Sequence, residues 1–526
     1  MSTSRTTDSM SVTTQAPPRG HPWPVLTLGA AVLVAAAVAV LIAPSDASVP
    51  HTLPANAQRI DIVDTPTSRP IPSGFIGLSI EYPSSLAYSG ANPAAPNPTF
   101  IRLVQQLNPS GSPVIRFGGD TTDWTWWPTP GVSRPRGIRY ALTRRWLAVT
   151  RATALALRAH LILGINLEAD RGIVARAEAR AFLKGIGRSL IGGFELGNEP
   201  EVYGSLPWYT THSGVGVRGR QARYDFRSYL IDYAAISSGL PREVPLVGPA
   251  SGSPSWTAQL SRYVGANPRV RMVTFHRYPL HRCFTQRGAS TYPTIANLLA
   301  PGSSSGPGLS LQAAVQVAHT HGLSLRADEL NSVSCGGARG VSDTFASALW
   351  VLDTLFKMAA VGVDGVNIHT FKRALYEPFS FTHSHGGWQA RVDPVYYGML
   401  MFARAAPTGS RLLSVRAASS RALRIWAVRA PDGTVRVTAI NDSPTRTLVL
   451  ALRPPRTSGA AHLERLTAPA LRSTTGVTIA GQTFGYATTT GELKRGYKLT
   501  ALQPIQHRYV VELPPASAAL LSVSGS

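Results

Sequence analysis

The stretch Phe194-Glu195-Leu196-Gly197-Asn198-Glu199-Pro200 begins as a short apolar run and ends in polar residues. It belongs to a series of eight such runs, which alternate with stretches of helical periodicity over residues 72–408. Eight strands that alternate with helices predict an α/β fold, the (β/α)8 barrel. The predicted strands are Phe75–Tyr82, Val114–Gly118, Leu161–Leu167, Gly193–Leu196, Leu246–Pro249, Met272–His276, Leu323–Ala327 and Val366–Phe371.

Helices are predicted between these strands. A doubly wound open sheet is the alternative fold, because it also alternates strands with helices. That fold usually places a Gly-rich phosphate loop after its first strand, and the sequence has none there. The predicted helices include Phe100–Leu107, Trp146–Ala159, Ala175–Ile186, Phe226–Ser238, Leu311–Thr320 and Thr344–Ala360.

The helical pattern stops near residue 409, and short strands separated by turns such as Pro431-Asp432-Gly433 follow. This pattern predicts a C-terminal all-β sandwich domain over residues 409–526. The run Arg59–Val63, which precedes the barrel, could supply one more strand to it. The predicted strands are Val415–Ala418, Leu423–Val428, Thr434–Ile440, Leu448–Leu452, Gly476–Ile479, Tyr497–Leu502 and Arg508–Leu513.

The amino-terminal part contains a candidate membrane segment. Residues 25–43 carry no charge and are numerous enough to cross a bilayer, and two arginines precede them. We therefore expect a transmembrane signal anchor that leaves the catalytic domain outside the cytoplasm. A cleaved signal peptide is the alternative, because Ser45-Asp46-Ala47 has a small-x-small form, and it would give a secreted protein. The expected parts are a cytoplasmic segment (1–24), the anchor (25–43), a tether with the possible strand (44–71), the catalytic barrel (72–408) and the β-sandwich (409–526).

The composition is that of a globular chain with a strongly basic balance. Hydrophobic residues make up 44% and charged residues 15%, which excludes a disordered chain. The net charge of +23 favours a polyanionic partner, either nucleic acid, anionic lipid or an acidic polysaccharide. The arginines are scattered without basic runs, however, so we predict no nucleic-acid partner, and we expect no cofactor.

Two predicted strands end in a glutamate, at positions where barrel enzymes carry their chemistry. Glu199 follows the fourth strand and Glu329 follows the seventh. Two carboxylates that flank one bond are what glycoside hydrolysis requires. Exposed glutamates are common and most have no function, but Asn198 precedes one of this pair, and His276-Arg277-Tyr278 ends the neighbouring sixth strand.

These motifs resemble the retaining glycosidases of clan A, and four of them in order resemble glycoside hydrolase family 79, the heparanases and β-glucuronidases. The resemblance implies Glu199 as the acid/base and Glu329 as the nucleophile of a retaining hydrolase that cleaves a β-linked uronic acid. It also implies that Asn198 binds the sugar 2-hydroxyl and that Tyr278 donates a hydrogen bond to the nucleophile. The motifs are Val114–Asp120, Phe194–Pro200, His276–Tyr278 and Ser342–Phe345.

The sequence departs from the heparanase pattern after the nucleophile. Heparanases carry a tyrosine followed by glycines there, which hold the uronate carboxylate, whereas this chain reads Ser334-Cys335-Gly336-Gly337. The amides of Gly336 and Gly337 could still bind an anion, but the tyrosine hydroxyl is missing. A neutral-sugar hydrolase of the arabinofuranosidase or xylosidase type therefore stays open. A non-catalytic polyanion-binding surface protein is the third possibility.

Further polar and aromatic residues follow the predicted strands. Arg116 near Glu329 would keep that carboxylate ionised. Glu81 could bind a sugar hydroxyl, although a salt bridge at the barrel mouth explains it equally well. No metal is predicted, because the histidines (276, 281, 383 and 385) lack a His-Glu-x-x-His arrangement. Other candidates are Asp120, the tryptophans Trp124, Trp126 and Trp127, which could stack on a sugar although at least one should pack in a core, and His369, Lys372 and Arg373.

The two cysteines are too few for a four-cysteine zinc site. Cys283 follows the sixth predicted strand and Cys335 follows the seventh, so the two lie on neighbouring loops of the barrel. We expect them to form a disulfide in an oxidising compartment. Two buried free thiols are the alternative.

Overall fold

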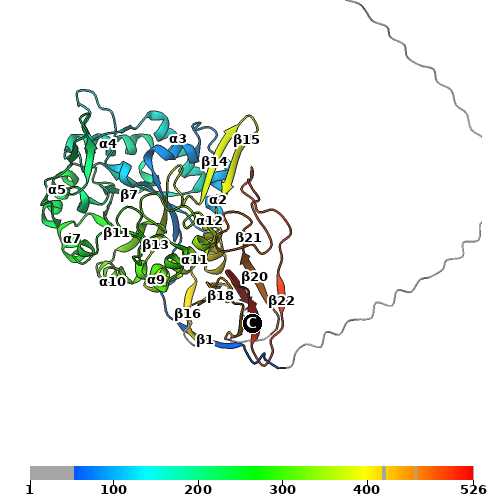
Figure 1. Cartoon of the computed structure of the whole chain (residues 1–526). Helices are drawn as coiled ribbons and strands as arrows, with labels where there is room; N and C mark the ends of the chain where they lie inside the picture. Colours follow the sequence, from blue (N-terminus) through cyan, green and yellow to red (C-terminus); the bar gives the residue numbers. More distant parts are fainter. Residues whose placement is uncertain (1–51, 418–421, 456–458, 525–526) are drawn as a thin grey trace, which may run out of the picture. The chain divides into compact units, whose positions relative to one another are not determined.

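The computed structural model describes residues 52–417, 422–455 and 459–524. Within them, eight parallel strands close into a barrel in the order β10-β11-β12-β13-β2-β3-β6-β7 (Figure 1). All eight runs that the sequence predicts as strands are found in it. The barrel strands are β2 (Ile76–Glu81), β3 (Val114–Gly118), β6 (His160–Ile165), β7 (Ile191–Leu196), β10 (Leu246–Ser251), β11 (Val270–Arg277), β12 (Ser324–Leu330) and β13 (Gly365–Thr370).

Helices connect the barrel strands, and α2 (Pro98–Leu107) shows how the sequence forms them. The Asn97 side chain caps α2 by accepting hydrogen bonds from two amides of its first turn. Phe100, Leu103 and Leu107 recur at helical spacing and are buried against the barrel. The other helices are α1 (Ser85–Ser89), α3 (Arg144–Leu157), α4 (Gly172–Gly185), α5 (Phe226–Ser238), α6 (Pro254–Thr257), α7 (Leu260–Ala266), α8 (Ile295–Leu298), α9 (Pro301–Leu309), α10 (Gln312–Thr320), α11 (Phe345–Ala360) and α12 (Pro394–Ala405). Short strand pairs are β4 (Thr125–Trp126) with β5 (Tyr140–Ala141), β8 (Pro207–Thr210) with β9 (Gly216–Arg218), and β14 (Phe379–Ser384) with β15 (Gly387–Val392).

The strands beyond the barrel form one continuous sheet, which has ten strands within the described residues. The predicted run Arg59–Val63 belongs to it as β1 (Gln58–Pro66), which pairs antiparallel with β16 and parallel with β19. Alternate residues of these strands, such as Ile60 and Ile62, point into one shared apolar core. The other nine strands are β16 (Arg411–Arg416), β17 (Leu423–Arg429), β18 (Val435–Asn441), β19 (Leu448–Arg453), β20 (Ala461–Thr467), β21 (Thr478–Ile479), β22 (Thr500–Leu502), β23 (Tyr509–Leu513) and β24 (Ser517–Val523).

Helix α11 joins the barrel to this sheet. The ring of Phe356, on α11, stacks on that of Trp426 of β17 with centroids 5.4 Å apart. The Trp426 indole also donates a 2.7 Å hydrogen bond to Asp353 of the same helix. Barrel and sheet are therefore packed together, and the described residues form one compact unit.

The membrane part of the predicted fold is corrected. No helix among the described residues is both long and apolar enough to pass through a bilayer. The stretch 25–43, where the signal anchor was expected, and the segment 1–24 lie outside the described residues. The fold that the structure supports is the parallel barrel with its packed β sheet, and the anchor is not part of it.

Candidate active site

A buried arginine connects the polar residues at the carboxyl ends of the barrel strands. The guanidinium of Arg116, on β3, donates to the Glu195 carboxylate of β7 at 2.6 Å and to Glu329 of β12 at 2.7 Å. Its third nitrogen donates to the side-chain oxygen of Asn198 at 2.9 Å. Arg116 is fully buried, and a buried cation needs such partners to offset its lost hydration. One side chain therefore fixes both strand ends that carry the predicted catalytic residues.

Glu329 is held in the ionised form. Tyr278, which follows β11, donates a 2.7 Å hydrogen bond to one of its oxygens, and His369 of β13 lies 3.6 Å from the other. Burial alone would raise the pKa of Glu329, but the positive charges of His369 and His276 outweigh it, with Arg116 adding to them. Together they hold the pKa well below the usual range for glutamate. An ionised carboxylate is what a nucleophile requires.

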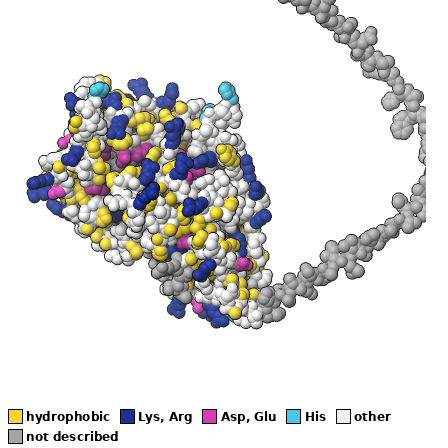
Figure 2. Space-filling model, viewed as in Figure 1, with side chains coloured by type: hydrophobic (Ala, Val, Ile, Leu, Met, Phe, Trp, Pro, Cys, Tyr) yellow, Lys and Arg dark blue, Asp and Glu magenta, His cyan; other side chains and the backbone are white. Residues whose placement is uncertain are grey.

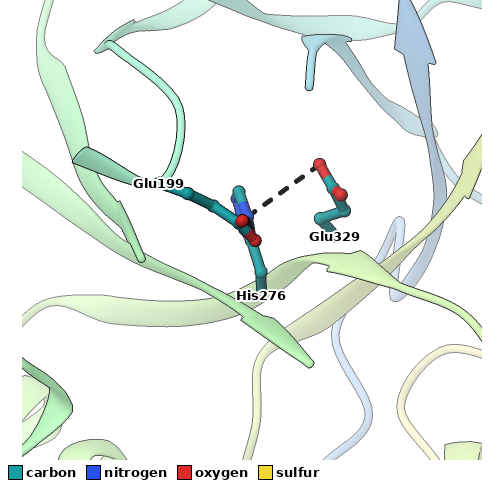
Figure 3. Close-up of side chains that lie close together, drawn as sticks. All are labelled: Glu199, His276 and Glu329. Carbon is teal, nitrogen blue, oxygen red and sulfur yellow. Dashed lines mark hydrogen bonds and ion pairs between the residues drawn. The ribbon is translucent and has the colours of Figure 1, made fainter. Parts of the chain in front are cut away.

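Glu199 faces Glu329 across a narrow space. It lies three residues after the end of β7 in a left-handed backbone conformation (φ 46°), and its amide donates to the Ala250 carbonyl at 2.8 Å. His276 Nδ1 lies 3.0 Å from its carboxylate, and Figure 3 shows this imidazole between the two glutamates. A carboxylate oxygen of Glu199 lies within 4.8 Å of one from Glu329. Retaining glycosidases separate their carboxyl groups by about 5–5.5 Å and inverting ones by about 6.5–9.5 Å, so this spacing fits the retaining geometry.

Glu199, His276 and Glu329 also lie close enough to one another to ligate a metal ion. Their donor atoms have protein partners, however. The Glu329 oxygens accept from Arg116 and Tyr278, and His276 Nδ1 lies against Glu199. Acid–base chemistry accounts for this group of side chains, and we assign no metal to it.

The loop after β7, which carries Asn198 and Glu199, is held by the buried carboxylate of Asp123, a residue that was not predicted from the sequence. One of its oxygens accepts from the Asn198 amide at 2.9 Å and from the Tyr203 hydroxyl at 2.6 Å. The other accepts from the amides of Leu167 and Glu168 at 2.9 and 3.0 Å. This buried carboxylate therefore ties the loop after β6 to the loop after β7.

Three polar side chains form a wall beside Glu329. Glu81, at the end of β2, accepts hydrogen bonds from the amide and hydroxyl of Thr121 and lies 3.5 Å from His369. Asp120 is the exposed member of this wall, and loss of hydration in the cleft together with the charges of Glu81 and Glu199 raises its pKa above the usual range. The side chains of Asp120 and Glu81 can both hydrogen-bond to sugar hydroxyls.

The catalytic pair opens into a cleft of about 810 Å³, a size typical of small-ligand sites. Of the two glycines predicted to bind an anion, Gly336 lines the cleft, whereas Gly337 packs against Leu375 and Tyr376 and is absent from the lining. Several lining residues were not predicted from the sequence, among them Glu201, Phe284 and Tyr376, because no motif marks them.

Cys283 and Cys335 are joined by a disulfide, with Cα atoms 6.3 Å apart. It links the loop after β11 to the loop after β12. Cys335, Gly336 and Gly337 have φ angles of 61°, 83° and 87°, in the left-handed region that glycine adopts without strain. The positive φ angles of this tight turn are therefore enough to explain why positions 336 and 337 are glycines, without a role in anion binding.

Other predicted residues lie away from the cleft. Trp126 packs in a separate apolar cluster with Trp208, as the core alternative expected, and the Arg139 guanidinium lies 3.8 Å from the Trp124 ring centre. Trp127 borders a different pocket. None of the three tryptophans lines the cleft, so nothing in this lining supports a sugar-stacking role for them. Lys372, Arg373, His383 and His385 are also absent from the lining, whereas His281 and His369 belong to it.

No protein-family model matches the sequence, and no curated protein matches it either. Solved structures are similar in fold. A 4-O-α-L-rhamnosyl-β-D-glucuronidase from Fusarium oxysporum 12S is 19% identical with a TM-score of 0.68, over 88% of this chain and 100% of its own. A family 51 arabinofuranosidase from Xanthomonas axonopodis pv. citri is 15% identical with a TM-score of 0.60, over 89% and 99%. A family 44 xyloglucanase from Paenibacillus polymyxa is 10% identical with a TM-score of 0.58, over 90% and 100%.

At these identities the similarity is one of fold, and it is shared with glycosidases of different substrates. Fold and site together are those of a glycoside hydrolase, because the barrel carries a close pair of glutamates at the ends of β7 and β12. The resemblance to family 79 rests on the sequence motifs.

Proposed function

We propose that the protein is a retaining glycoside hydrolase that removes a β-linked uronic acid from a glycan or glycoconjugate. The observation that carries the catalytic part is the pair of Glu199 and Glu329, with carboxylate oxygens within 4.8 Å. That spacing leaves no room for a water molecule to attack behind the sugar, as an inverting enzyme needs, and fits direct attack by a carboxylate.

In this mechanism, Glu329 attacks the anomeric carbon while Glu199 donates a proton to the leaving oxygen. The ester that forms neutralises Glu329, so Arg116 and Tyr278 lose an ionised partner at this step. Glu199, now unprotonated, then removes a proton from the incoming water, which attacks the ester and releases the sugar with its original configuration. His276, 3.0 Å from Glu199, orients that carboxylate through both steps.

The uronide specificity rests on three observations. The motifs resemble family 79, one structural neighbour is a glucuronidase, and Gly336 lines the cleft at a left-handed turn. No hydrogen bond from the Gly336 amide to another group is found among the described residues, so this amide is available to a sugar carboxylate. Tyr376 supplies a phenol in the same cleft, with its ring centre 6.4 Å from that of Tyr278, although the tyrosine that heparanases carry after the nucleophile is missing from this chain.

A neutral-sugar hydrolase is the second candidate, and the charge of the cleft favours it. Five carboxylates line the cleft, and the uronate would have to bind among them. Several structural neighbours are arabinofuranosidases. A non-catalytic polyanion-binding protein remains the third candidate, although it would need neither glutamate.

One assay separates the three candidates. The kcat/KM values are measured on the 4-nitrophenyl β-glucuronide, β-glucoside, β-xyloside and α-L-arabinofuranoside. We expect the β-glucuronide to be cleaved at least about tenfold better than any neutral glycoside, because a paired carboxylate contributes roughly 1.5–3 kcal/mol. Equal or better cleavage of a neutral glycoside supports the second candidate. Cleavage of none supports the third.

We also propose that the barrel acts outside the cytoplasm. The disulfide between Cys283 and Cys335 supports this, because such bonds persist mainly in oxidising compartments.

A further inference from the structure

The cleft has two unlike walls. Glu81 on β2, Asp120 in the segment that follows β3, and His369 on β13 form the polar wall beside Glu329. The opposite wall is built by the loops after β7, β10 and β11, on the side of the barrel that carries Glu199. A general acid must lie beside the oxygen it protonates. On the proposed hydrolase function, on which this inference rests, the leaving group therefore occupies the second wall.

The second wall presents exposed apolar side chains. Phe284, after β11, and Leu206, after β7, line the cleft with 68% and 42% of their surfaces exposed. Pro254, Pro279 and Pro307 belong to the same lining. Large apolar groups left exposed beside a polar site are typical of ligand contacts.

The cleft offers no unengaged lysine or arginine among the described residues. Arg277 is the single lysine or arginine in the lining of the cleft, and its side chain is buried. Its guanidinium donates to the Ser310 hydroxyl, the His276 carbonyl and the Thr257 hydroxyl at 2.7, 2.6 and 2.8 Å. Lysines and arginines are instead spread over the molecular face drawn in Figure 2. The net charge of +23 is thus not concentrated in the cleft, which makes a sulfated or uronic-acid polymer a poor leaving group.

The disulfide anchors the backbone next to the exposed ring. Phe284 directly follows Cys283, whose partner Cys335 lies on the adjacent loop and itself lines the cleft. A crosslinked loop loses less backbone freedom when a ligand binds than a free loop does. An exposed aromatic ring on such a loop is suited to stack on a flat partner.

We infer that the leaving-group side of the cleft binds an uncharged ring with an apolar face, such as an aryl group, and that Phe284 is the stacking residue that selects it. Leu206, on the same wall, supplies a second apolar contact. The enzyme would then remove a terminal sugar from small apolar conjugates rather than cleave within an acidic polysaccharide.

The test compares two glycosides of the sugar that the enzyme cleaves best, one with 2-phenylethanol and one with ethanol as the leaving alcohol. Both are alkyl alcohols, so the comparison isolates the ring. In Phe284→Ala we expect kcat/KM to fall about tenfold on the phenylethyl glycoside, mainly through KM, and to change less than about twofold on the ethyl glycoside. Tyr486→Ala is the matched control, since Tyr486 is 85% exposed and does not line the cleft. It should change neither value.

Reduction of the disulfide in the wild-type protein is a second measurement, and it should raise KM for the phenylethyl glycoside selectively. Heparin oligosaccharides should not inhibit cleavage of either glycoside at moderate salt. Equal losses on both glycosides in Phe284→Ala, or strong competitive inhibition by heparin, would overturn the inference while leaving the hydrolase function intact. If wild-type protein cleaves no glycoside of any sugar, the proposed function itself fails, and this inference with it.

Discussion

Arg116 and Glu329 lie 2.7 Å apart in the barrel interior, and the same guanidinium reaches Asn198, the residue before Glu199. The nucleophile and the acid/base therefore depend on one buried cation for their position. Burial of Arg116 opposes its charge, but Glu195 and the other carboxylates around it raise its pKa well above the usual range. It stays charged at every pH at which the protein is folded, so the two glutamates keep their relative position across the working pH range.

Glu199→Gln should separate the two chemical steps. Without the acid, cleavage of alkyl glycosides should fall by roughly 10²–10⁴-fold, because the leaving alcohol is no longer protonated. A 4-nitrophenyl glycoside needs less protonation and should form the glycosyl-enzyme almost normally. Added azide should then restore turnover, because it attacks without a base. Wild-type activity on an alkyl glycoside would show that Glu199 is not the acid.

His369→Asn should move the acid limb of the pH profile. His369 is the nearby positive charge that lowers the pKa of Glu329 most, against the opposing effect of burial. Its removal raises that pKa, so Glu329 becomes protonated, and inactive, at a higher pH than in the wild type. We expect kcat/KM of the variant to be lower than that of the wild type between about pH 3 and 5, and the difference to be smaller near pH 7. An unshifted acid limb in a variant with normal thermal stability would contradict this role of His369.

Asp123→Asn should lower kcat more than it raises KM. One of the two Asp123 oxygens becomes an N–H₂ group, which faces N–H or O–H donors on either side and leaves them unpaired, at a cost of about 1–3 kcal/mol. Displacement of Asn198 and Glu199 should then reduce kcat about tenfold or more. Tyr203→Phe is the matched control, since it removes the hydroxyl that donates to Asp123 and accepts from the Asn198 amide, but keeps the hydrogen bond from that amide to Asp123. A lower Tm with unchanged kcat in Asp123→Asn would mean that Asp123 only stabilises the fold.

The protein should contain no free thiol when it is unfolded without a reductant. Cys283 and Cys335 are its two cysteines, and they are bonded to each other. Thiol titration of the protein in denaturant, isolated without a reductant, measures this directly. Two thiols per chain would refute both the bridge and the oxidising compartment that we propose.

The barrel could be predicted from the sequence because each strand is a buried apolar run bounded by polar residues. At Val114–Gly118 prediction and structure agree at both ends, although this run also contains the charged Arg116. Two strands of the β sheet were missed for physical reasons. Strand β24 (Ser517–Val523) is rich in alanine and buried on both faces, so it shows no alternation, and β20 (Ala461–Thr467) contains Glu464 and Arg465, which have low strand propensity.

Within the site, sequence motifs identified the residues that follow strands but not those that loops bring in from elsewhere. Glu199, Glu329 and Tyr278 lie at strand ends, and the order of strands in a barrel places them together. Asp123 and Phe284 lie on loops without any motif, and only the folded structure shows that one supports Asn198 and the other lines the cleft. The role of the three tryptophans could not be predicted from the sequence, because an aromatic side chain is as well suited to a hydrophobic core as to a sugar-binding surface.

The central claim is that Glu329 is the nucleophile of a retaining hydrolase, and trapping of the covalent intermediate tests it most directly. The protein is incubated with the 2-deoxy-2-fluoro glycosyl fluoride of the sugar that it cleaves best, and the intact mass and peptide masses are measured. We predict one adduct per chain, on the peptide that contains Glu329, and none in Glu329→Gln, which should fold normally because the side chain keeps its shape. An adduct on another residue, or no adduct together with a product of inverted anomeric configuration, would contradict the account.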